Sequence, residues 1–200
     1  MSLPETAPEA EPSLFPEDGI DSLRFAVVDL ETRNVCAGPG AVIEVGIALM
    51  ERGEITEEWG SLVRPSGPVG DWVSKLTGIT DGMVAGAPAF AEIAPKVEEM
   101  LRGRIFVAHN VSFDWKMIRG EMPGLPARTP RLCTVRMGRA LVPEAPRHSL
   151  DVLCAFLGIE LGRHHRALDD ARAAAKILAA LLKRDGAEKW TAAQLAKFRA

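Results

Sequence analysis

One short stretch near the start of the chain constrains its fold more than any other. The apolar run of residues 25–28, FAVV, leads directly into Asp29, and Glu31 follows two positions later. Such a run is typical of a buried strand, and side chains two positions apart on a strand project from the same face of the sheet. Two neighbouring carboxylates repel each other unless one is protonated or a cation lies between them. The stretch therefore predicts a buried strand that ends in either a solvated pair of acids or a cation site.

The composition is that of a globular protein with one domain. The chain has 200 residues, of which 47% are hydrophobic and 26% are charged, and this is enough apolar material for one sizeable core. Its formal net charge of -3 argues against a protein that coats nucleic acid by charge alone, although it allows an enzyme that grips the end of a strand. No apolar run reaches the roughly 18 residues of a membrane span, so we expect no membrane span. The N-terminus has no basic start and no apolar h-region, so we expect no secretory signal.

The three cysteines, Cys36, Cys133 and Cys154, are far apart in the chain and form no CxxC pair. Their odd number and wide spacing are typical of reduced thiols in a cytosolic protein. We therefore expect a cytoplasmic location.

The ends of the chain differ in character from its middle. Residues 1–22 carry prolines at positions 4, 8, 12 and 16, and no Lys or Arg precedes Arg24, so we expect a disordered acidic, proline-rich tail. Residues 23–185 are expected to form the folded domain. Residues 186–200 are expected to form a short C-terminal helix or tail.

The pattern of apolar and turn residues predicts an α/β fold. Strands are expected at residues 24–31, 41–50, 54–65, 104–109 and 128–134, the second and third forming a hairpin. Helices are expected from residue 88 onward and at residues 111–122, 134–141, 149–159 and 168–184, with loops or short helices at 65–87. Three consecutive strands followed by alternating helices and strands indicate a mixed sheet with helices on both faces.

Two residues in the expected helices carry a local prediction. Pro95 lies inside the helical pattern that begins near residue 88, so the helix should bend or restart there. Ser149 directly precedes the segment 150–159 and should cap that helix.

Two further segments bring acids to the ends of predicted elements. The segment FVAHNVSFDW places Asp114 in the first turn of a helix, shortly after a buried strand, and HHRALDDA places histidine and aspartate at the start of the long helix. Each has an ordinary structural explanation, because acids favour helix starts and isolated histidines are usually structural. The order of all these residues along the chain is more informative than any one of them.

This order resembles the DEDDh family of 3'-5' exonucleases, which includes the proofreading epsilon subunit of DNA polymerase III. The matching motifs are VVDLET, HNVSFD and HRALDDA, with secondary matches in LTGITDGMVAGAPAF and HSLDVLCAFLGI. The resemblance extends over residues 24–183. It implies an RNase H-like fold, in which helices flank a five-stranded mixed sheet on both faces.

Hydrolysis of a phosphodiester explains why such a family needs clustered acids. Two divalent cations about 4 Å apart activate the attacking water and stabilise the leaving oxygen. Carboxylates suit Mg²⁺ or Mn²⁺. The resemblance implies that Asp29 bridges both ions, that Glu31 and Asp170 hold the ion carrying the water, and that Asp114 serves the second ion.

The resemblance also assigns His165 as the general base for the attacking water. An unperturbed histidine pKa of about 6.5 suits that task near neutral pH. A sister group of these exonucleases uses tyrosine instead, and this chain contains no tyrosine. Only the histidine version therefore applies.

Helical phase separates His165 and Asp170 from the equally spaced His164 and Asp169. Steps of four, seven and eleven from Asp170 reach only apolar residues, whereas the same steps from Asp169 include Lys176. Asp170 should therefore face inward and Asp169 should face solvent. The family has an alanine two residues after its histidine, and Ala167 matches His165. We accordingly expect His164 and Asp169 on the surface, and a His164→Ala change to be nearly silent.

The resemblance suggests four substrate contacts. Thr32 would meet the terminal 3'-OH through its hydroxyl or backbone N–H. His109, Asn110 and Phe113 would line the terminal nucleotide, or else merely pack around the metal site. The family often continues with Thr-Gly where this chain has Arg33 and Asn34, which leaves the loop contacts open.

A locally basic stretch could meet phosphates or form a solvated helix face. Its members are Arg128, Arg131, Arg136, Arg139 and Arg147.

These observations favour a metal-dependent 3'-5' exonuclease that releases nucleoside 5'-monophosphates from single-stranded 3' ends, with DNA preferred and with proofreading or repair in trans. A 3'-5' exoribonuclease of the same fold is the first alternative, because the choice depends on contacts at the 2'-hydroxyl. A non-catalytic nucleic-acid-binding adaptor is the second. An adaptor has no need to keep every metal ligand, and this chain keeps all of them.

The segment 194–198, QLAKF, loosely resembles peptides with which replication proteins bind sliding clamps. A DNA polymerase subunit or a sliding clamp is therefore a candidate partner. The alternative is a terminal turn that packs Leu195 and Phe198 on the domain.

Overall fold

The computed structural model describes residues 23–36, 38–184, 195 and 197–198. The predicted tail of residues 1–22 lies outside the described residues, as does most of the predicted C-terminal helix. The domain boundaries drawn from the sequence therefore stay predictions.

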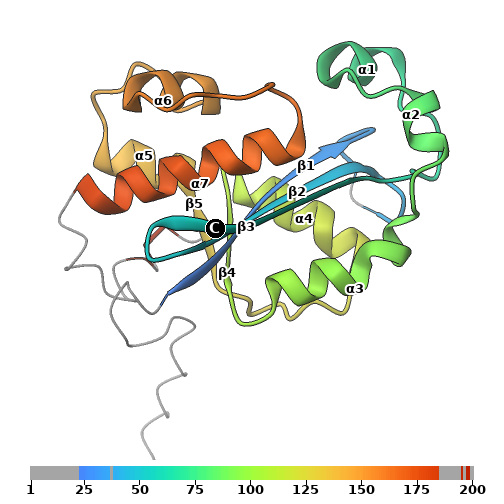
Figure 1. Cartoon of the computed structure of the whole chain (residues 1–200), viewed down its shortest axis with the longest axis horizontal. Helices are drawn as coiled ribbons and strands as arrows, with labels where there is room; N and C mark the ends of the chain where they lie inside the picture. The colour runs from blue at the N-terminus through green and yellow to red at the C-terminus, as the bar shows by residue number, and fades with distance from the viewer. Residues whose placement is uncertain (1–22, 37, 185–194, 196, 199–200) are drawn as a thin grey trace, which may run out of the picture.

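Five strands form one mixed sheet, as the sequence predicts (Figure 1). The strands are Arg24–Thr32 (β1), Val42–Glu51 (β2), Glu54–Leu62 (β3), Ile105–Ala108 (β4) and Arg131–Cys133 (β5). Their order across the sheet is β3-β2-β1-β4-β5. β2 runs antiparallel to β1 and β3, whereas β4 is parallel to both β1 and β5.

The predicted hairpin joins β2 and β3 through Arg52 and Gly53. Both residues have positive φ, 53° and 80°, which is the backbone of the tight turns that match the twist of paired strands. Expected strand ends differ from the observed ones mainly at β3 and β5, where Pro and loop residues shorten the ladder.

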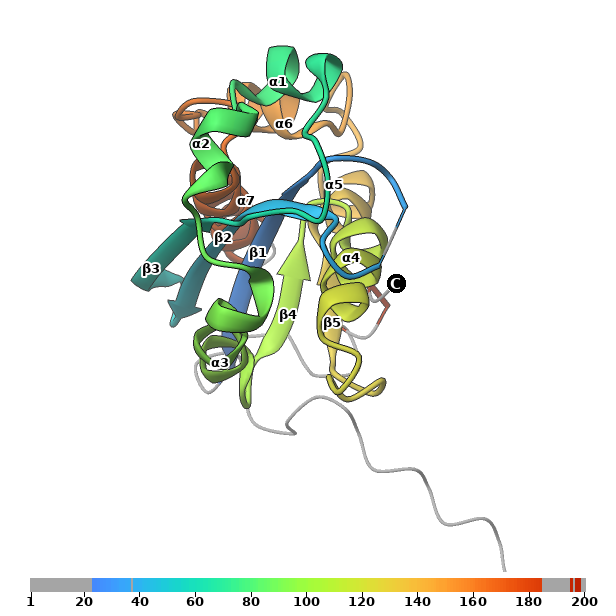
Figure 2. The ribbon, with the colours of Figure 1, turned by 90° about the vertical axis from the view of Figure 1, so that its right-hand side faces the viewer.

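Seven helices lie among the described residues. They are Asp71–Thr77 (α1), Asp81–Ala85 (α2), Phe90–Leu101 (α3), Val111–Glu121 (α4), Thr134–Leu141 (α5), Leu150–Leu157 (α6) and Ala167–Arg184 (α7). α5, α6 and α7 cover one face of the sheet, α3 and α4 cover the other, and α1 and α2 lie at one end (Figure 2). No helix in this part of the chain is both long and apolar enough to cross a membrane.

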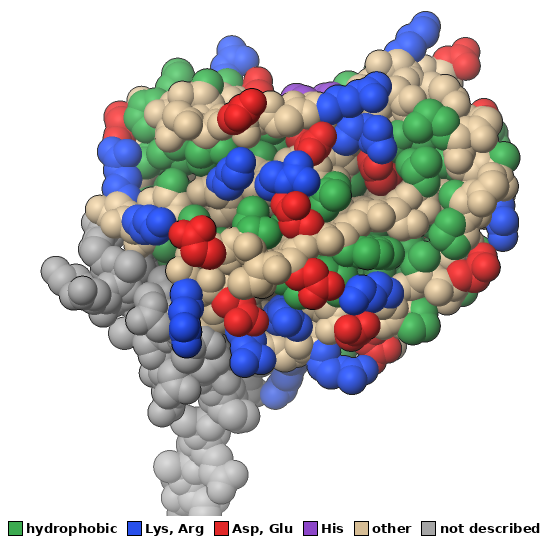
Figure 3. Space-filling view, viewed as in Figure 1, with side chains coloured by type: hydrophobic (Ala, Val, Ile, Leu, Met, Phe, Trp, Pro, Cys, Tyr) green, Lys and Arg blue, Asp and Glu red, His purple; other side chains and the backbone are tan. Residues whose placement is uncertain are grey.

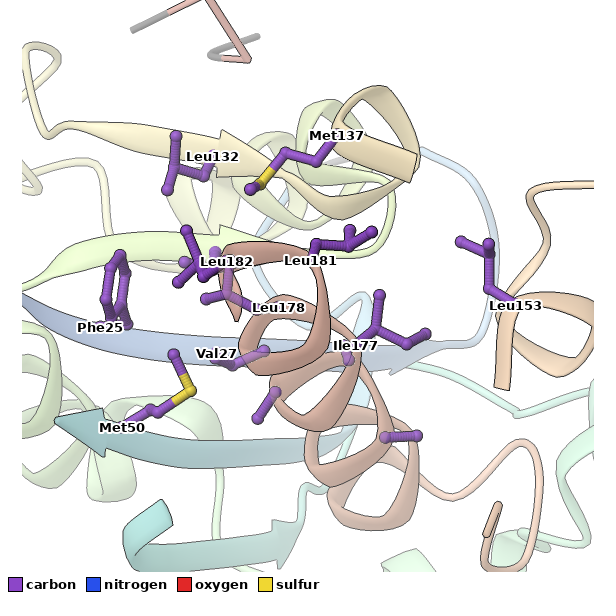
Figure 4. Close-up of a cluster of buried hydrophobic side chains, with 14 of the residues drawn as sticks. Phe25, Val27, Met50, Leu132, Met137, Leu153, Ile177, Leu178, Leu181 and Leu182 are labelled. Atoms are coloured by element: carbon purple, nitrogen blue, oxygen red, sulfur yellow. The ribbon is translucent and has the colours of Figure 1, made fainter. Parts of the chain in front are cut away.

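β1 is buried on both faces of the sheet, which explains its unbroken apolar run. Phe25 and Val27 pack with α7 residues such as Leu178 (Figure 4). Ala26 and Val28 belong to the core under α3 and α4. The strand that carries the two acids is therefore held from both sides.

The structure corrects part of each local helix prediction. α3 continues through Pro95 as one helix, so it does not restart there, whereas the predicted bend stays a prediction. Ala91, whose carbonyl would otherwise accept the missing N–H, is exposed, so water can satisfy it. Ser149 does precede α6, but no side-chain capping bond forms, and its hydroxyl instead bonds the carboxylate of Asp151.

The C-terminal turn packs on the domain. Leu195 is fully buried against the α7 face of the sheet, and Phe198 packs on the same core. The carbonyl of Phe198 accepts the N–H of Cys133 at 3.1 Å. The alternative reading of this segment as a packed turn is confirmed, so binding to a clamp would require these residues to leave the core.

α7 approaches the sheet closely at Gly46 on β2. A Cβ added to Gly46 would lie 2.2 Å from the backbone carbon and oxygen of Ala167. Gly46 is the cross-strand partner of Asp29. The missing side chain therefore allows the first turn of α7 to lie directly above the acidic end of β1.

We expect Gly46→Ala to lower the free energy of unfolding by about 1–3 kcal/mol, because the added methyl overlaps the backbone of α7. Gly86→Ala is the matched control, since a Cβ at Gly86 meets nothing within 4 Å and its φ of -95° is allowed for alanine. Urea unfolding of both variants measures the difference. Equal midpoints for the two variants would contradict the close approach.

Candidate active site

Three elements bring four carboxylates together at one edge of the sheet. Asp29 and Glu31 lie at the C-terminal end of β1, Asp114 lies in the first turn of α4, and Asp170 lies in the first turn of α7. Because β4 is parallel to β1 and α4 follows β4, both enter the site from the same edge. Ligand oxygens of Asp29, Glu31 and Asp170 all lie within 4.8 Å of one another.

The carboxylates disfavour one another's charge. Burial raises the pKa of Asp29 well above its ordinary value, and repulsion from Asp114, Asp170 and Glu31 raises it further. Burial and the same kind of repulsion raise the pKa of Glu31 to about 8. Burial raises the pKa of Asp114 to about 7. Burial also raises the pKa of Asp170, against the opposing effect of a neighbouring histidine.

This arrangement fits divalent cations. The donor atoms are hard carboxylate oxygens, which Mg²⁺ and Mn²⁺ prefer to softer ligands. Burial and repulsion between the carboxylates raise the pKa values of Asp29 and Glu31, and bound cations would favour the ionised carboxylates.

Glu44 on β2 is a fifth acid at this edge, and the sequence predictions missed it. It is buried, lies opposite Glu31 across the β1–β2 ladder, and pairs with the guanidinium of Arg166. Its Oε2 also accepts the N–H of Ala167 at 2.9 Å. The sequence did contain a signal for Glu44, because a charged residue within the apolar run of residues 41–50 is as unusual as Asp29 at the end of the run in β1.

His165 lies in the turn before α7 with its backbone in the left-handed region, at φ 62°. Its backbone N–H donates to Oδ2 of Asp170 at 3.0 Å. Burial and the neighbouring His164 lower the pKa of His165, so its ring is neutral around pH 7. A neutral imidazole beside the carboxylates is able to accept a proton.

His164 is closer to the carboxylates than predicted. Its side chain is 37% exposed, but its Nδ1 lies 3.1 Å from both carboxylate oxygens of Asp170. Its ring also stacks on His165, with centroids 4.0 Å apart. The expected exposure of His164 is therefore confirmed, but its contact with Asp170 was not expected, so the prediction that it has no part in the site needs correction.

The predicted orientation of the neighbouring aspartates is confirmed. The side chain of Asp170 is 5% exposed, whereas that of Asp169 is 29% exposed. Asp169 pairs with Arg172 at 2.6 Å and accepts the N–H of Arg163 at 3.1 Å. Helical phase thus identified the inward residue correctly.

Thr32, Asn110 and Phe113 lie at the same edge of the sheet, at the end of β1 and the start of α4. The hydroxyl of Thr32 donates to the carbonyl of Asn34 at 2.7 Å, and its oxygen can still accept a bond from a 3'-OH. Asn110 is exposed at the start of α4, and Phe113 is half-buried against the core. Contacts of these residues with a nucleotide stay predictions.

His109 is engaged within the protein. Its Nε2 donates to the carbonyl of His148 at 3.0 Å, and its Nδ1 lies 2.9 Å from the hydroxyl of Thr134. Burial lowers its pKa to about 4, so the ring is neutral. A polar contact of His109 with a nucleotide would require one of these bonds to break, which favours the packing alternative.

Glu121 at the end of α4 anchors the loop after Thr32. Its carboxylate accepts the backbone N–H groups of residues 40–42 at 3.0, 2.9 and 3.2 Å. Arg33 in the same loop donates to the carbonyl of Pro68 at 3.0 Å. This anchor was not predicted, because a glutamate at a helix end gives no sequence signal of its distant partners.

One member of the basic stretch is engaged within the protein, and contacts of the others with phosphates stay predictions. Arg131 lies over the ring of Trp115, 4.7 Å from its centroid, and donates to the carbonyls of Ala127 and Thr129. The others are exposed, namely Arg128, Arg136, Arg139 and Arg147.

The sequence model of a family described as exonuclease matches residues 26–178. The chain is 33% identical over 184 residues to the DNA polymerase III PolC-type of Caldanaerobacter subterraneus subsp. tengcongensis, which covers 91% of this chain and 13% of that protein. It is 36% identical over 169 residues to the DNA polymerase III PolC-type of Bacillus subtilis, covering 82% and 12% of the two. The chain thus spans about an eighth of the length of these relatives.

Solved structures agree with these sequence matches. The structure of exonuclease X in complex with 5' overhanging duplex DNA has a TM-score of 0.70 and 28% identity, and the match covers 88% of this chain and 98% of that chain. The nuclease domain of 3'hExo, described as a DEDDh family member bound to rAMP, has a TM-score of 0.67 and 22% identity, with coverage of 84% and 95%.

The chain belongs to the exonuclease family. Within that family its motifs, its PolC-type relatives and its structural neighbours confirm the resemblance to the DEDDh exonucleases and the RNase H-like fold.

The raised pKa values predict how the stability of the metal-free protein depends on pH. The pKa of Glu31 rises from 4.5 to about 8 on folding, so the folded state binds more protons than the unfolded chain between these values. The free energy of unfolding therefore falls as pH rises through this window. We expect the thermal midpoint in EDTA to be lower at pH 8 than at pH 5, and Mn²⁺ at pH 8 to raise it.

Glu31→Gln is the control for this effect, because it removes one titrating group and one repelling charge. The variant should show a smaller loss of thermal midpoint between pH 5 and pH 8 than the wild type. An equal loss in both proteins, or a midpoint unaffected by Mn²⁺, would contradict the assignment.

Proposed function

We propose that this chain is a metal-dependent 3'-5' exonuclease that releases nucleoside 5'-monophosphates from single-stranded 3' ends. The observation that carries the proposal is the convergence of Asp29, Glu31, Asp114 and Asp170 with His165 at one edge of the sheet. Membership of the exonuclease family supports it.

The four carboxylates would hold two divalent cations, Mg²⁺ or Mn²⁺, which when bound supply charge stabilisation and an acidified water. Asp29 has the central position, since each of the other three carboxylates acts on it. Asp114 approaches from the α4 side and Asp170 from the α7 side. The approach of Asp114 and Asp170 from opposite sides supports the predicted role of Asp114 at one ion. The proximity of Glu31 to Asp170 supports their predicted role at the other ion.

His165 would accept the proton of the attacking water at a ring nitrogen. Its lowered pKa keeps the ring neutral, and the bond from its N–H to Asp170 holds its backbone beside the site. General-base catalysis of this kind contributes on the order of 10²–10⁴-fold in rate.

The substrate end would lie beside Thr32, with Asn110 and Phe113 next to the terminal nucleotide. Acidic and basic side chains alternate over the face shown in Figure 3, where histidine side chains reach the surface near the upper edge. That face offers no continuous basic track. On the face shown, the mixed charges support a protein that binds the end of a strand rather than its length.

DNA is the favoured substrate, because the sequence relatives are DNA polymerases and the neighbour at 28% identity was solved with duplex DNA. RNA is the alternative substrate. The third reading, a non-catalytic adaptor, is disfavoured because every expected metal ligand and the histidine are present.

The proposal extends to location and partners: the chain would act in the cytoplasm, in proofreading or repair, together with a polymerase on a separate chain. The identity to PolC-type polymerases over a small part of their length supports it, and the three free cysteines suit a reducing compartment.

We expect Asp29→Ala to abolish mononucleotide release from labelled single-stranded DNA and RNA in Mn²⁺, while the protein stays folded by circular dichroism. Removing one repelling carboxylate relieves strain in the metal-free state. Asp169→Ala is the matched control, because Asp169 pairs with Arg172 on the outer side of α7 and should retain activity. Full activity of Asp29→Ala, or of the wild type in excess EDTA, would refute the proposal.

The two histidines should differ in a single-turnover assay. His165→Ala should lower the cleavage rate by on the order of a hundredfold or more, because the base is lost. His164→Ala should cost less, although more than the silent change expected from sequence, because His164 contacts Asp170. Exchanged outcomes for the two variants would show that His164 is the base.

A further inference from the structure

The ion pair of Glu44 and Arg166 is built into the site but has no role in the chemistry above. Glu44 lies on β2 opposite Glu31, and only 8% of its side chain is exposed. The guanidinium of Arg166 donates to both carboxylate oxygens, from Nε at 3.1 and 3.2 Å and from Nη2 at 2.6 Å. Such a two-pronged contact fixes the orientation of both side chains.

Glu44 also holds the start of α7. The first N–H groups of a helix have no partner within the helix, and Glu44 accepts that of Ala167, the first residue of α7, at 2.9 Å. The negative charge also suits the positive end of the helix dipole. In the same turn, the N–H of Asp170 donates to the carbonyl of Arg166 at 3.0 Å. Glu44 thus holds the turn that carries His165 and Asp170.

The pair also affects the charge of the site. Glu44 and Arg166 form a close ion pair of opposite charges, so together they add little net charge. The remaining four carboxylates carry a charge equal and opposite to that of two divalent cations. Without Arg166 the site would hold a fifth carboxylate with no partner of opposite charge. Without Glu44 it would hold the unpaired positive charge of Arg166.

We propose that Glu44 and Arg166 are positioning residues, which fix the first turn of α7 over β1 and keep the charge of the site matched to two divalent cations. This inference rests on the proposed metal-dependent exonuclease. Neither residue touches the substrate in this role. Both act through Asp170, His165 and the charge that the ions meet.

The test compares Glu44→Gln, Arg166→Gln and the double variant in the full chain. Mn²⁺ binding is followed by the electron paramagnetic resonance signal of the free ion, and single-turnover cleavage of single-stranded DNA is measured separately. Glu44→Gln should weaken Mn²⁺ binding roughly tenfold, and Arg166→Gln should strengthen it, because the uncompensated charges have opposite signs. The double variant should return binding towards the wild type, yet cleave slowly because the clamp on α7 is lost.

Glu58→Gln is the matched control, since Glu58 on β3 pairs with Arg172 of the same helix at 2.6 Å but away from the four carboxylates. It should leave Mn²⁺ binding unchanged. Where Glu44→Gln fails to fold, Arg166→Lys provides the test, because lysine keeps the charge but loses the two-pronged contact. Its Mn²⁺ binding should match the wild type while cleavage slows.

Shifts in the same direction for both single variants, or no shift in either, would overturn the inference. These results are distinct from failure of the proposed function. If the wild type binds Mn²⁺ with the expected shifts among its variants but cleaves neither DNA nor RNA, the positioning role stands and the exonuclease proposal fails.

Discussion

The burial of four carboxylates together at the end of β1 is the constraint on which the rest of the structure depends. Burial raises the pKa values of Asp29, Glu31, Asp114 and Asp170, and repulsion between carboxylates raises those of Asp29 and Glu31 further, so folding holds together groups that would separate in water. The apolar core has to outweigh that cost. β1 is well suited to it, because its apolar side chains are buried on both faces of the sheet.

The close approach of α7 to the sheet depends on one glycine and one ion pair. Gly46 leaves room for the helix backbone, and the contact of Glu44 with Ala167 and Arg166 ties the helix start to β2. Precise placement by a rigid scaffold is what a metal-dependent reaction requires, since binding geometry on the ångström scale sets the rate. The same contacts therefore serve both the fold and the site.

The sequence predicted the fold class, the order of the elements and the inward face of Asp170, because these follow from local periodicity and from motifs. It did not reveal the pairing of Glu44 with Arg166, the anchor at Glu121 or the contact of His164 with Asp170. Each of these contacts joins residues that come together only in the folded chain. The packing of α7 and α4 brings the first two together, and the left-handed turn at His165 accompanies the third. The helix does not restart at Pro95, one of the two outcomes that the sequence allowed, because the exposed side of a helix tolerates the loss of one backbone hydrogen bond.

The alanine-rich face of α7 has a consequence for mutational tolerance. Ala173, Ala174 and Ala175 are buried in the core that faces the sheet, so the helix has little slack there. A larger side chain at one of these positions would displace α7 from the sheet and move Asp170 away from β1. Core positions remote from the chemistry are therefore expected to govern catalytic competence, and variation along this helix should be restricted well beyond the residues that meet the ions.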